Sequence, residues 1–270
     1  MADKKNSKIW TEKPKESHTW QVDGKEMRKP NWIIFLEVVK EHFGVMYSSG
    51  FIFLISLLPG ALILYVGINE NASLFCLLGG ILAGLLGGPT LAGTFDTVLR
   101  CLREEPGYWR SYYKKAWKQN WKQGMKAGAV IGALLGLWGW MAHLMYTADV
   151  DVPATVWISL GISALLLMMV VQYYFAQMVL LTLSSSELLR NSCLMTVGYL
   201  PQSLIAGIVA AIYWGTMAVG LPYTLIFLVT TGGWFPVLIG VLEIYPPINK
   251  THHIDEKQEL LDEEKYNSMF

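Results

Sequence analysis

The chain has 270 residues, with 21 basic and 21 acidic side chains, so its formal net charge is zero. Hydrophobic residues make up 53% of the chain and charged residues only 16%, whereas a soluble domain carries about 25% charged residues. This deficit of charge argues against a soluble domain and favours a membrane protein.

Long windows without a charged residue predict membrane-spanning helices. The clearest window, residues 152–186, contains no Asp, Glu, Lys or Arg, and apolar runs of about 18 residues or more are typical of membrane spans. We expect spans near residues 45–68, 74–95, 126–146, 155–183, 199–218 and 225–243. The domain division follows from them: a polar N-terminal segment over residues 1–31, a transmembrane domain over residues 32–245 and an acidic tail over residues 246–270. The predicted fold class is all-α, a polytopic membrane protein with about six transmembrane helices and interfacial amphipathic helices on the cytoplasmic side.

The charges of the loops predict the orientation. The loops that follow the first, third and fifth spans ("GINENAS", "TADVDVP" and "VGLPYT") contain no Lys or Arg. All 21 basic residues fall on the other side, and basic residues are retained on the cytoplasmic side of membrane proteins. We therefore expect a multi-pass protein whose N- and C-termini are both cytoplasmic.

The segment before the first span, "NWIIFLEVVKEHF", has an apolar side that includes Ile33, Ile34, Val38 and Phe43. We expect it to lie at the membrane interface until the chain turns inward at Gly44.

Two consecutive spans carry small residues at every fourth position. The glycines are Gly80, Gly84 and Gly88 in the second span, and Gly124, Gly128, Gly132 and Gly136 at the third. Because lipid tails are as apolar as leucine, membrane helices depend on close van der Waals packing, which small residues permit. We expect the two rows to face each other within one chain. The alternative is a homodimer contact through one of them.

The loop after the second span contains two neighbouring stripes of side chains. Pro106-Gly107 is expected to divide this loop into two helices. In the second helix, aromatic residues recur at Trp109, Tyr113, Trp117 and Trp121, and basic residues at Arg110, Lys114, Lys118 and Lys122. Aromatic rings prefer the headgroup level and a basic face favours anionic lipid. The pattern predicts an amphipathic helix in the membrane plane, at the membrane interface or docked on a partner. Nucleic-acid binding is rejected because spans flank the segment on both sides.

Polar residues inside the spans are few. The fourth span carries Gln172, Tyr173 and Gln177, which are expected either to hydrogen-bond between helices or to line a polar cavity for a sugar-like ligand. No span has an Asp, Glu, Lys or Arg at its centre, which argues against an ion-coupled transporter. In the sixth span, Pro236 is expected to introduce a kink and Glu243 to mark the inner end.

No pattern typical of an enzyme or a metal site is found. Cys76, Cys101 and Cys193 are scattered, without the spacing of disulfides or metal ligands. His252-His253 is too short to be a metal site without other ligands. Phosphate-binding loops, nucleophile elbows and metalloprotease motifs are absent from the sequence. We therefore expect no catalytic residues, no cofactor and no metal.

Two stretches, "GGPTLAGTFDTVLRCLREEPGYWRSYYKKAWKQNWKQG" and "LLRNSCLMTVGYLPQSL", resemble the YesL-like family of bacterial integral membrane proteins. The matching positions are Gly88, Pro89, Arg100, Asn191, Leu200 and Pro201, with Ser192 standing where the family has alanine. The likeness extends over roughly residues 30–245 and leaves both termini unexplained. It implies a bacterial cell membrane and a sugar-uptake context, because members of the family are often encoded beside carbohydrate ABC importers. It supplies no catalytic residues.

The function that the resemblance implies is that of a non-catalytic accessory or modulating subunit of a carbohydrate ABC importer. The broad basic surface and the scarcity of pore chemistry favour this function. Two alternatives remain open: a small transporter or channel for a neutral polar solute acting alone, and a membrane sensor or enzyme. The expected partners are membrane lipids and a sugar ABC importer or another membrane complex.

Overall fold

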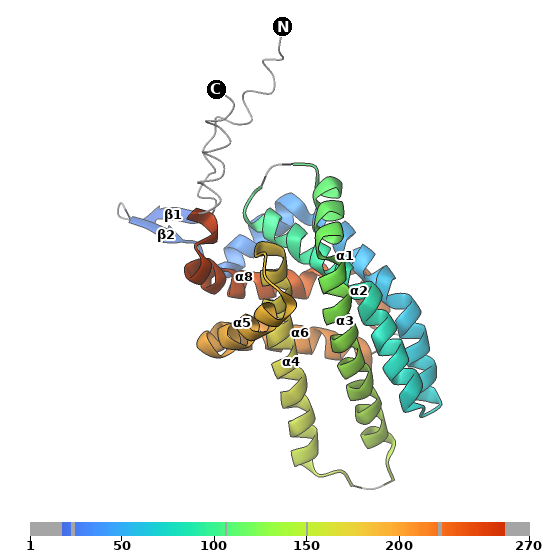
Figure 1. The fold of residues 1–270 in the computed structure, drawn as a ribbon. Coiled ribbons are helices and arrows are strands. Elements are labelled where there is room, and N and C mark those ends of the chain that lie inside the picture. Colours follow the sequence, from blue (N-terminus) through green and yellow to red (C-terminus); the bar gives the residue numbers. More distant parts are fainter. Residues whose placement is uncertain (1–17, 23–24, 106, 150, 221–222, 257–270) are drawn as a thin grey trace.

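The computed structural model describes residues 18–22, 25–105, 107–149, 151–220 and 223–256. Within these ranges the chain forms a short β-hairpin followed by eight helices (Figure 1). The elements are β1 (Thr19–Val22), β2 (Lys25–Arg28), α1 (Asn31–Asn69), α2 (Ser73–Leu102), α3 (Trp109–Thr147), α4 (Ala154–Leu180), α5 (Ser185–Gly198), α6 (Leu200–Val219), α7 (Leu225–Thr231) and α8 (Trp234–His252).

Five of these helices, α1, α2, α3, α4 and α6, are long and apolar enough to cross a membrane. Helices α7 and α8 pass the same test only as a pair, which is bent by 54°. The described residues therefore contain five candidate spans, or six if the bent pair is one span. This confirms the predicted fold class, an all-α polytopic membrane protein.

The loops after α1 and α3, which lack Lys and Arg, and the basic start of α3 lie at opposite ends of the molecule. The loops that follow α1 and α3 lie at the bottom of Figure 1, whereas the β-hairpin, the start of α3 and the last turns of α8 lie toward the top. The basic first turns of α3 are thus far from the two loops that lack Lys and Arg.

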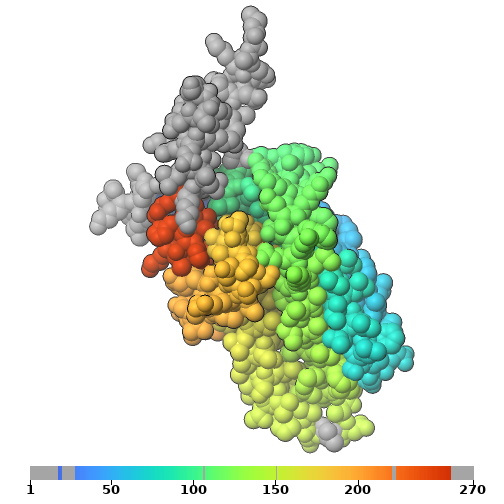
Figure 2. Space-filling view, viewed as in Figure 1, coloured from blue at the N-terminus to red at the C-terminus, as the bar shows by residue number. Residues whose placement is uncertain are grey.

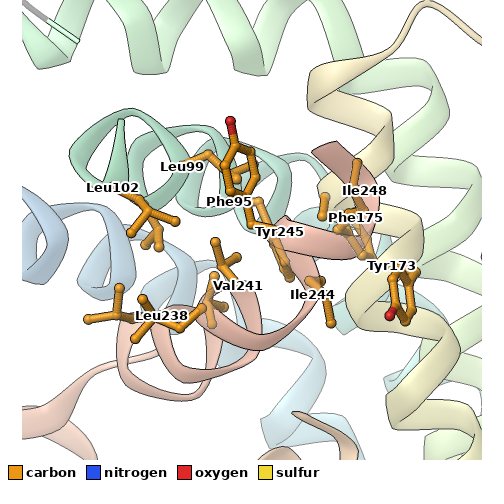
Figure 3. Close-up of a cluster of buried hydrophobic side chains, with 14 of the residues drawn as sticks. Phe95, Leu99, Leu102, Tyr173, Phe175, Leu238, Val241, Ile244, Tyr245 and Ile248 are labelled. Carbon is orange, nitrogen blue, oxygen red and sulfur yellow. The ribbon is translucent and has the colours of Figure 1, made fainter. Parts of the chain in front are cut away.

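The core lies near the top of the bundle and is built around α8. Figure 3 shows Val241, Ile244 and Ile248 of α8 in one cluster with Phe95 of α2 and Phe175 of α4. All five are buried, and the rings of Phe95 and Phe175 stack with their centroids 5.9 Å apart. Helix α8 is therefore a central element of the packing, although it follows the other described helices in the chain.

The lower halves of α3 and α4 project away from this core as a hairpin (Figures 1 and 2). Large apolar side chains are exposed there, among them Val130, Leu134, Ile158 and Ile162. Water would penalise such a surface, whereas lipid tails accommodate it. The projecting hairpin is therefore consistent with a membrane environment.

The hairpin of β1 and β2 lies in the N-terminal segment, for which no secondary structure was predicted. The two strands pair antiparallel, with Thr19 opposite Arg28 and Val22 opposite Lys25. The sequence between them is Asp23-Gly24, a dipeptide typical of two-residue hairpin turns. The sequence therefore carries a local signal for this hairpin.

Helix α1 does not turn at Gly44, contrary to the prediction. It is one helix of 39 residues that includes the segment expected to lie at the interface. Ile34, Val38 and Met46 are all buried, so one apolar stripe continues across Gly44. An isolated glycine costs a helix only about 1 kcal/mol relative to alanine, and the packing of this stripe outweighs that cost.

Helix α3 corrects a second prediction. Pro106-Gly107 does lie between α2 and α3, but the aromatic-basic segment is not a separate helix in the membrane plane. It forms the first turns of α3, which runs without a break for 39 residues. Gly124, at the expected junction, is buried against Pro89 of α2, so the chain gains its packing by continuing straight.

The break in the last span occurs before Pro236 rather than at it. Gly232 has a positive φ of 63°, which glycine adopts without steric cost, and it separates α7 from α8. Pro236 lies in the first turn of α8, where the missing N–H would have no helical partner in any case. The predicted kink at Pro236 is therefore wrong.

Candidate functional site

The two rows of glycines meet along α2 and α3. A Cβ at Gly84 would overlap the carbonyl oxygen of Gly128, and one at Gly128 would overlap that of Gly84. Gly80 and Gly132 repeat this reciprocal contact, a Cβ at Gly88 would overlap the carbonyl oxygen of Gly124, and Gly136 lies against the backbone of Cys76. Both rows are used within one chain, so neither is left for the alternative homodimer contact.

The basic stripe of α3 lies on the surface. Arg110, Lys114, Lys118 and Lys122 are all exposed. None of the four forms an ion pair with another described residue. Their charges are consequently available to an external anionic group.

The aromatic stripe divides into an anchored half and an exposed half. The ring of Tyr113 packs on Gly93, and its hydroxyl donates to the carbonyl oxygen of Thr90 at 3.4 Å. Trp109 contacts Tyr113 edge to face, with centroids 5.9 Å apart. Trp117 and Trp121 are 39% and 42% exposed, so these two rings are the ones available at the surface.

A cluster of four charged side chains lies at the end of α2, beside the basic stripe. Asp96 accepts a hydrogen bond from Nε of Arg100 at 2.9 Å. Glu105 is shared by Arg100 and Arg103. The cluster has two positive and two negative groups, which compensate each other within a largely shielded site.

The aromatic ring of Tyr112 and a small cavity lie beside this charged cluster. The guanidinium of Arg100 lies 4.4 Å from the centroid of the Tyr112 ring, which favours a cation on its face. The adjacent cavity of about 100 Å³ is lined by His42, Thr97 and Trp109 in addition to Arg100, Glu105 and Tyr112. It is much smaller than the ~300–1,000 Å³ of pockets that take drug-sized ligands.

The polar residues of the fourth span lie in the packed core. Gln172, Tyr173 and Gln177 are 5%, 0% and 0% exposed. The amide of Gln172 lies against Gly240 and donates to the carbonyl oxygen of Pro236 at 3.4 Å, which ties α4 to α8. The Tyr173 hydroxyl accepts from Ser203 of α6 at 3.4 Å. Gln172 and Tyr173 thus form hydrogen bonds between helices, which is the first of the two roles expected from the sequence.

The N-terminal residues dock on the same end as the charged cluster. His18 Nε2 donates to the carbonyl oxygen of Leu102 at 2.7 Å, and Lys29 pairs with Glu37 at 2.8 Å. Asn31 donates to Glu243 of α8 at 2.8 Å. Glu243 therefore holds the start of α1, a role that the sequence did not indicate.

Helix α5 is a second amphipathic element. Ser184 and Glu187 form a capping box at its start, and the hydrogen bonds from Ser184 lower the pKa of the Glu187 carboxyl. Leu188 and Met195 are buried, whereas Leu189, Leu194 and Val197 are exposed. A short helix with apolar side chains on its outer face is typical of the membrane interface.

Histidines and cysteines do not gather into a ligand set. Across the described residues, no group of three or more His, Cys, Asp or Glu side chains has an arrangement that could hold a metal ion. His253 instead lies 3.1 Å from Glu256 in an ion-pair geometry.

These features define a polytopic membrane protein with a close-packed glycine contact and a basic, aromatic surface at one end. A family model described as "Protein of unknown function, DUF624" matches residues 66–140. The match spans the end of α1, all of α2 and most of α3, so it contains both glycine rows, the charged cluster and the basic stripe. It is consistent with a resemblance to the YesL-like family. No curated protein and no solved structure matches the chain.

Proposed function

We propose that the protein is a non-catalytic subunit of a larger membrane complex, which it contacts through the basic stripe of α3. The observation that carries the proposal is the contrast between two neighbouring sets of charges. Arg100 and Arg103 are neutralised by Asp96 and Glu105, whereas the basic stripe is exposed and unpaired within the described residues. Charges that a fold leaves unpaired on one face steer association with a complementary surface.

The proposed partner is a carbohydrate ABC importer in a bacterial cell membrane. The resemblance to the YesL-like family supports this choice, and the family match over residues 66–140 is consistent with that resemblance. The match contains the basic stripe, so the surface that we assign to the partner lies in the part of the chain with recognisable relatives.

Changing the basic stripe should separate partner binding from folding. The variant R110Q/K114Q/K118Q/K122Q is expected to insert normally, because Lys115, Lys126 and the N-terminal basic residues remain. It should lose most of its partner when it is purified from native membranes, as measured by quantitative mass spectrometry of the co-purified proteins. The matched control is K115Q/K126Q, which alters two exposed lysines of α3 outside the stripe. A quadruple variant that keeps its full set of partners would refute the proposed docking surface.

The proposal also requires the basic stripe to face the cytoplasm. A cysteine at Asp149, in a loop without Lys or Arg, should react with an impermeant thiol reagent applied to intact cells. A cysteine at Ser111, beside the basic stripe, should react only after the cells are opened. Both changes are made in a Cys193→Ser background, because Cys193 is exposed whereas Cys76 and Cys101 are buried. The reverse labelling pattern would overturn the orientation.

A further inference from the structure

An open groove runs between α1 and the first turns of α3. It has a volume of about 440 Å³ and is lined chiefly by Tyr47, Phe51 and Ile52 on one side and by Trp109, Arg110 and Tyr113 on the other. Five of these six side chains are apolar or aromatic, and Arg110 supplies a single charge. The groove thus combines a long apolar wall with one cationic group.

The walls of the groove are held in place before any ligand binds. On α1, the rings of Tyr47 and Phe51 stack with centroids 6.0 Å apart. On α3, Trp109 leans on Tyr113, and Tyr113 is itself fixed by Gly93 and the carbonyl oxygen of Thr90. A preformed apolar groove loses little conformational freedom when it is filled.

The length of α1 places the groove at the expected depth of lipid headgroups. About 20 helical residues cross the hydrocarbon core of a membrane, and counting back from the end of α1 at Asn69 brings that limit to Gly50. Tyr47 is then just outside the hydrocarbon, and Phe51 and Ile52 are just inside it. Trp and Tyr side chains are enriched at this level.

The charge at the groove selects the sign of the ligand. Arg110 is exposed and forms no ion pair with any described residue. Glu105 lines the adjoining cavity and is the acidic residue nearest to Arg110 in the sequence. Its carboxylate is already paired with Arg100 and Arg103. Lys114 lies one helical turn beyond Arg110 and adds to the positive potential. A lipid whose phosphate is not balanced by a positive group in the same headgroup complements this surface.

We propose that the groove holds one anionic phospholipid, with an acyl chain along Phe51 and Ile52 and the phosphate beside Arg110. The site shares Arg110 with the basic stripe, but it does not depend on the function proposed above. It requires only that the chain is embedded in a bilayer and that the groove is accessible from the lipid.

The test uses the full chain, purified in detergent without a partner and titrated with phosphatidylglycerol or with phosphatidylcholine of the same acyl chains. Native mass spectrometry counts the lipids that remain bound. One phosphatidylglycerol is expected to bind ahead of any phosphatidylcholine. R110Q should weaken phosphatidylglycerol about five-fold, since one basic residue near an anionic headgroup contributes about 1 kcal/mol, and should leave phosphatidylcholine unchanged. K118Q, an exposed lysine of the same helix outside the groove, is the matched control.

A second variant tests the apolar wall. Ile52→Trp fills the groove from an exposed position, 38% accessible in the wild type, and should abolish the single tight site for either lipid at an unchanged melting temperature. Equal loss of phosphatidylglycerol in R110Q and K118Q would overturn the assignment of the phosphate to Arg110. Unchanged lipid binding in Ile52→Trp would show that the bound lipid is annular. If R110Q weakens partner binding but no lipid is lost, Arg110 belongs to the partner surface and the lipid site is refuted.

Discussion

Replacing Gly128 by leucine is expected to destabilise the protein strongly. The Cβ at this position would overlap the backbone carbonyl of Gly84, and backbone atoms cannot rotate aside as a side chain can. Overpacking typically costs about 1–3 kcal/mol, and an obstacle made of backbone places this variant at the upper end of that range or above it. The thermal unfolding midpoint of the detergent-solubilised protein should fall by several degrees.

Gly139→Leu is the matched control, because it lies on the same helix with nothing within 4 Å of a Cβ. It should leave the midpoint near that of the wild type. Gly132→Leu, opposite Gly80, should behave like Gly128→Leu. An unchanged midpoint in both Gly128→Leu and Gly132→Leu would contradict the close contact between α2 and α3.

Replacing Arg100 by methionine is expected to cost about 3 kcal/mol of stability, the lower end of the range for breaking a buried ion pair by removing one partner. The side chain of Asp96 is only 9% exposed and its described ion-pair partner is Arg100. Methionine fills much of the same space but removes the ion-pair partner of the Asp96 carboxylate, which leaves the more distant charges of Arg103 and Lys115 near it. Glu105 loses only one of its two ion-pair partners, because Arg103 remains beside it.

The double variant Asp96→Asn/Arg100→Met distinguishes this loss from a general loss of packing. Asparagine at position 96 removes the negative charge that has lost its ion-pair partner. The double variant should therefore be more stable than Arg100→Met alone when both are compared by thermal unfolding. Lys118→Met, at an exposed position, should have little effect. Additive effects of the two single substitutions would show that Asp96 and Arg100 do not depend on each other.

The elements with a strong periodic signal were predictable from the sequence. Charge-free windows predicted the spans of α2, α4 and α6 to within several residues, because the length of a span is fixed by the thickness of the bilayer. The four-residue spacing of Gly80, Gly84 and Gly88 predicted a close-packed face. The partner face was also predictable, since the only comparable row lies on the next span.

The positions at which helices break or continue were not predictable in the same way. Gly44 and Gly124 have the residue type of a break, yet tertiary packing carries the helix through both. Gly232 has the same residue type and does break the chain, because its positive φ lets α8 turn into the core. Nothing local to the sequence distinguishes these three glycines, since the deciding contacts come from other helices.

The candidate site was predictable only in part. The basic and aromatic stripes follow from helical periodicity alone. The pairing of Glu105 with Arg100 and Arg103 depends on how the chain leaves α2, and that of Asn31 with Glu243 joins positions separated by 212 residues. Contacts over such separations carry no signature in a single sequence.

The contact between Asn31 and Glu243 has a consequence for the order of synthesis. The beginning of α1 is made before the other helices, whereas its hydrogen-bonding partner belongs to α8, which follows them in the described part of the chain. The surface on which the N-terminal residues dock is therefore incomplete until the whole membrane domain has been inserted. Because α8 also contributes many of the buried core residues, we expect the helices made before it to complete their packing only once α8 is in place.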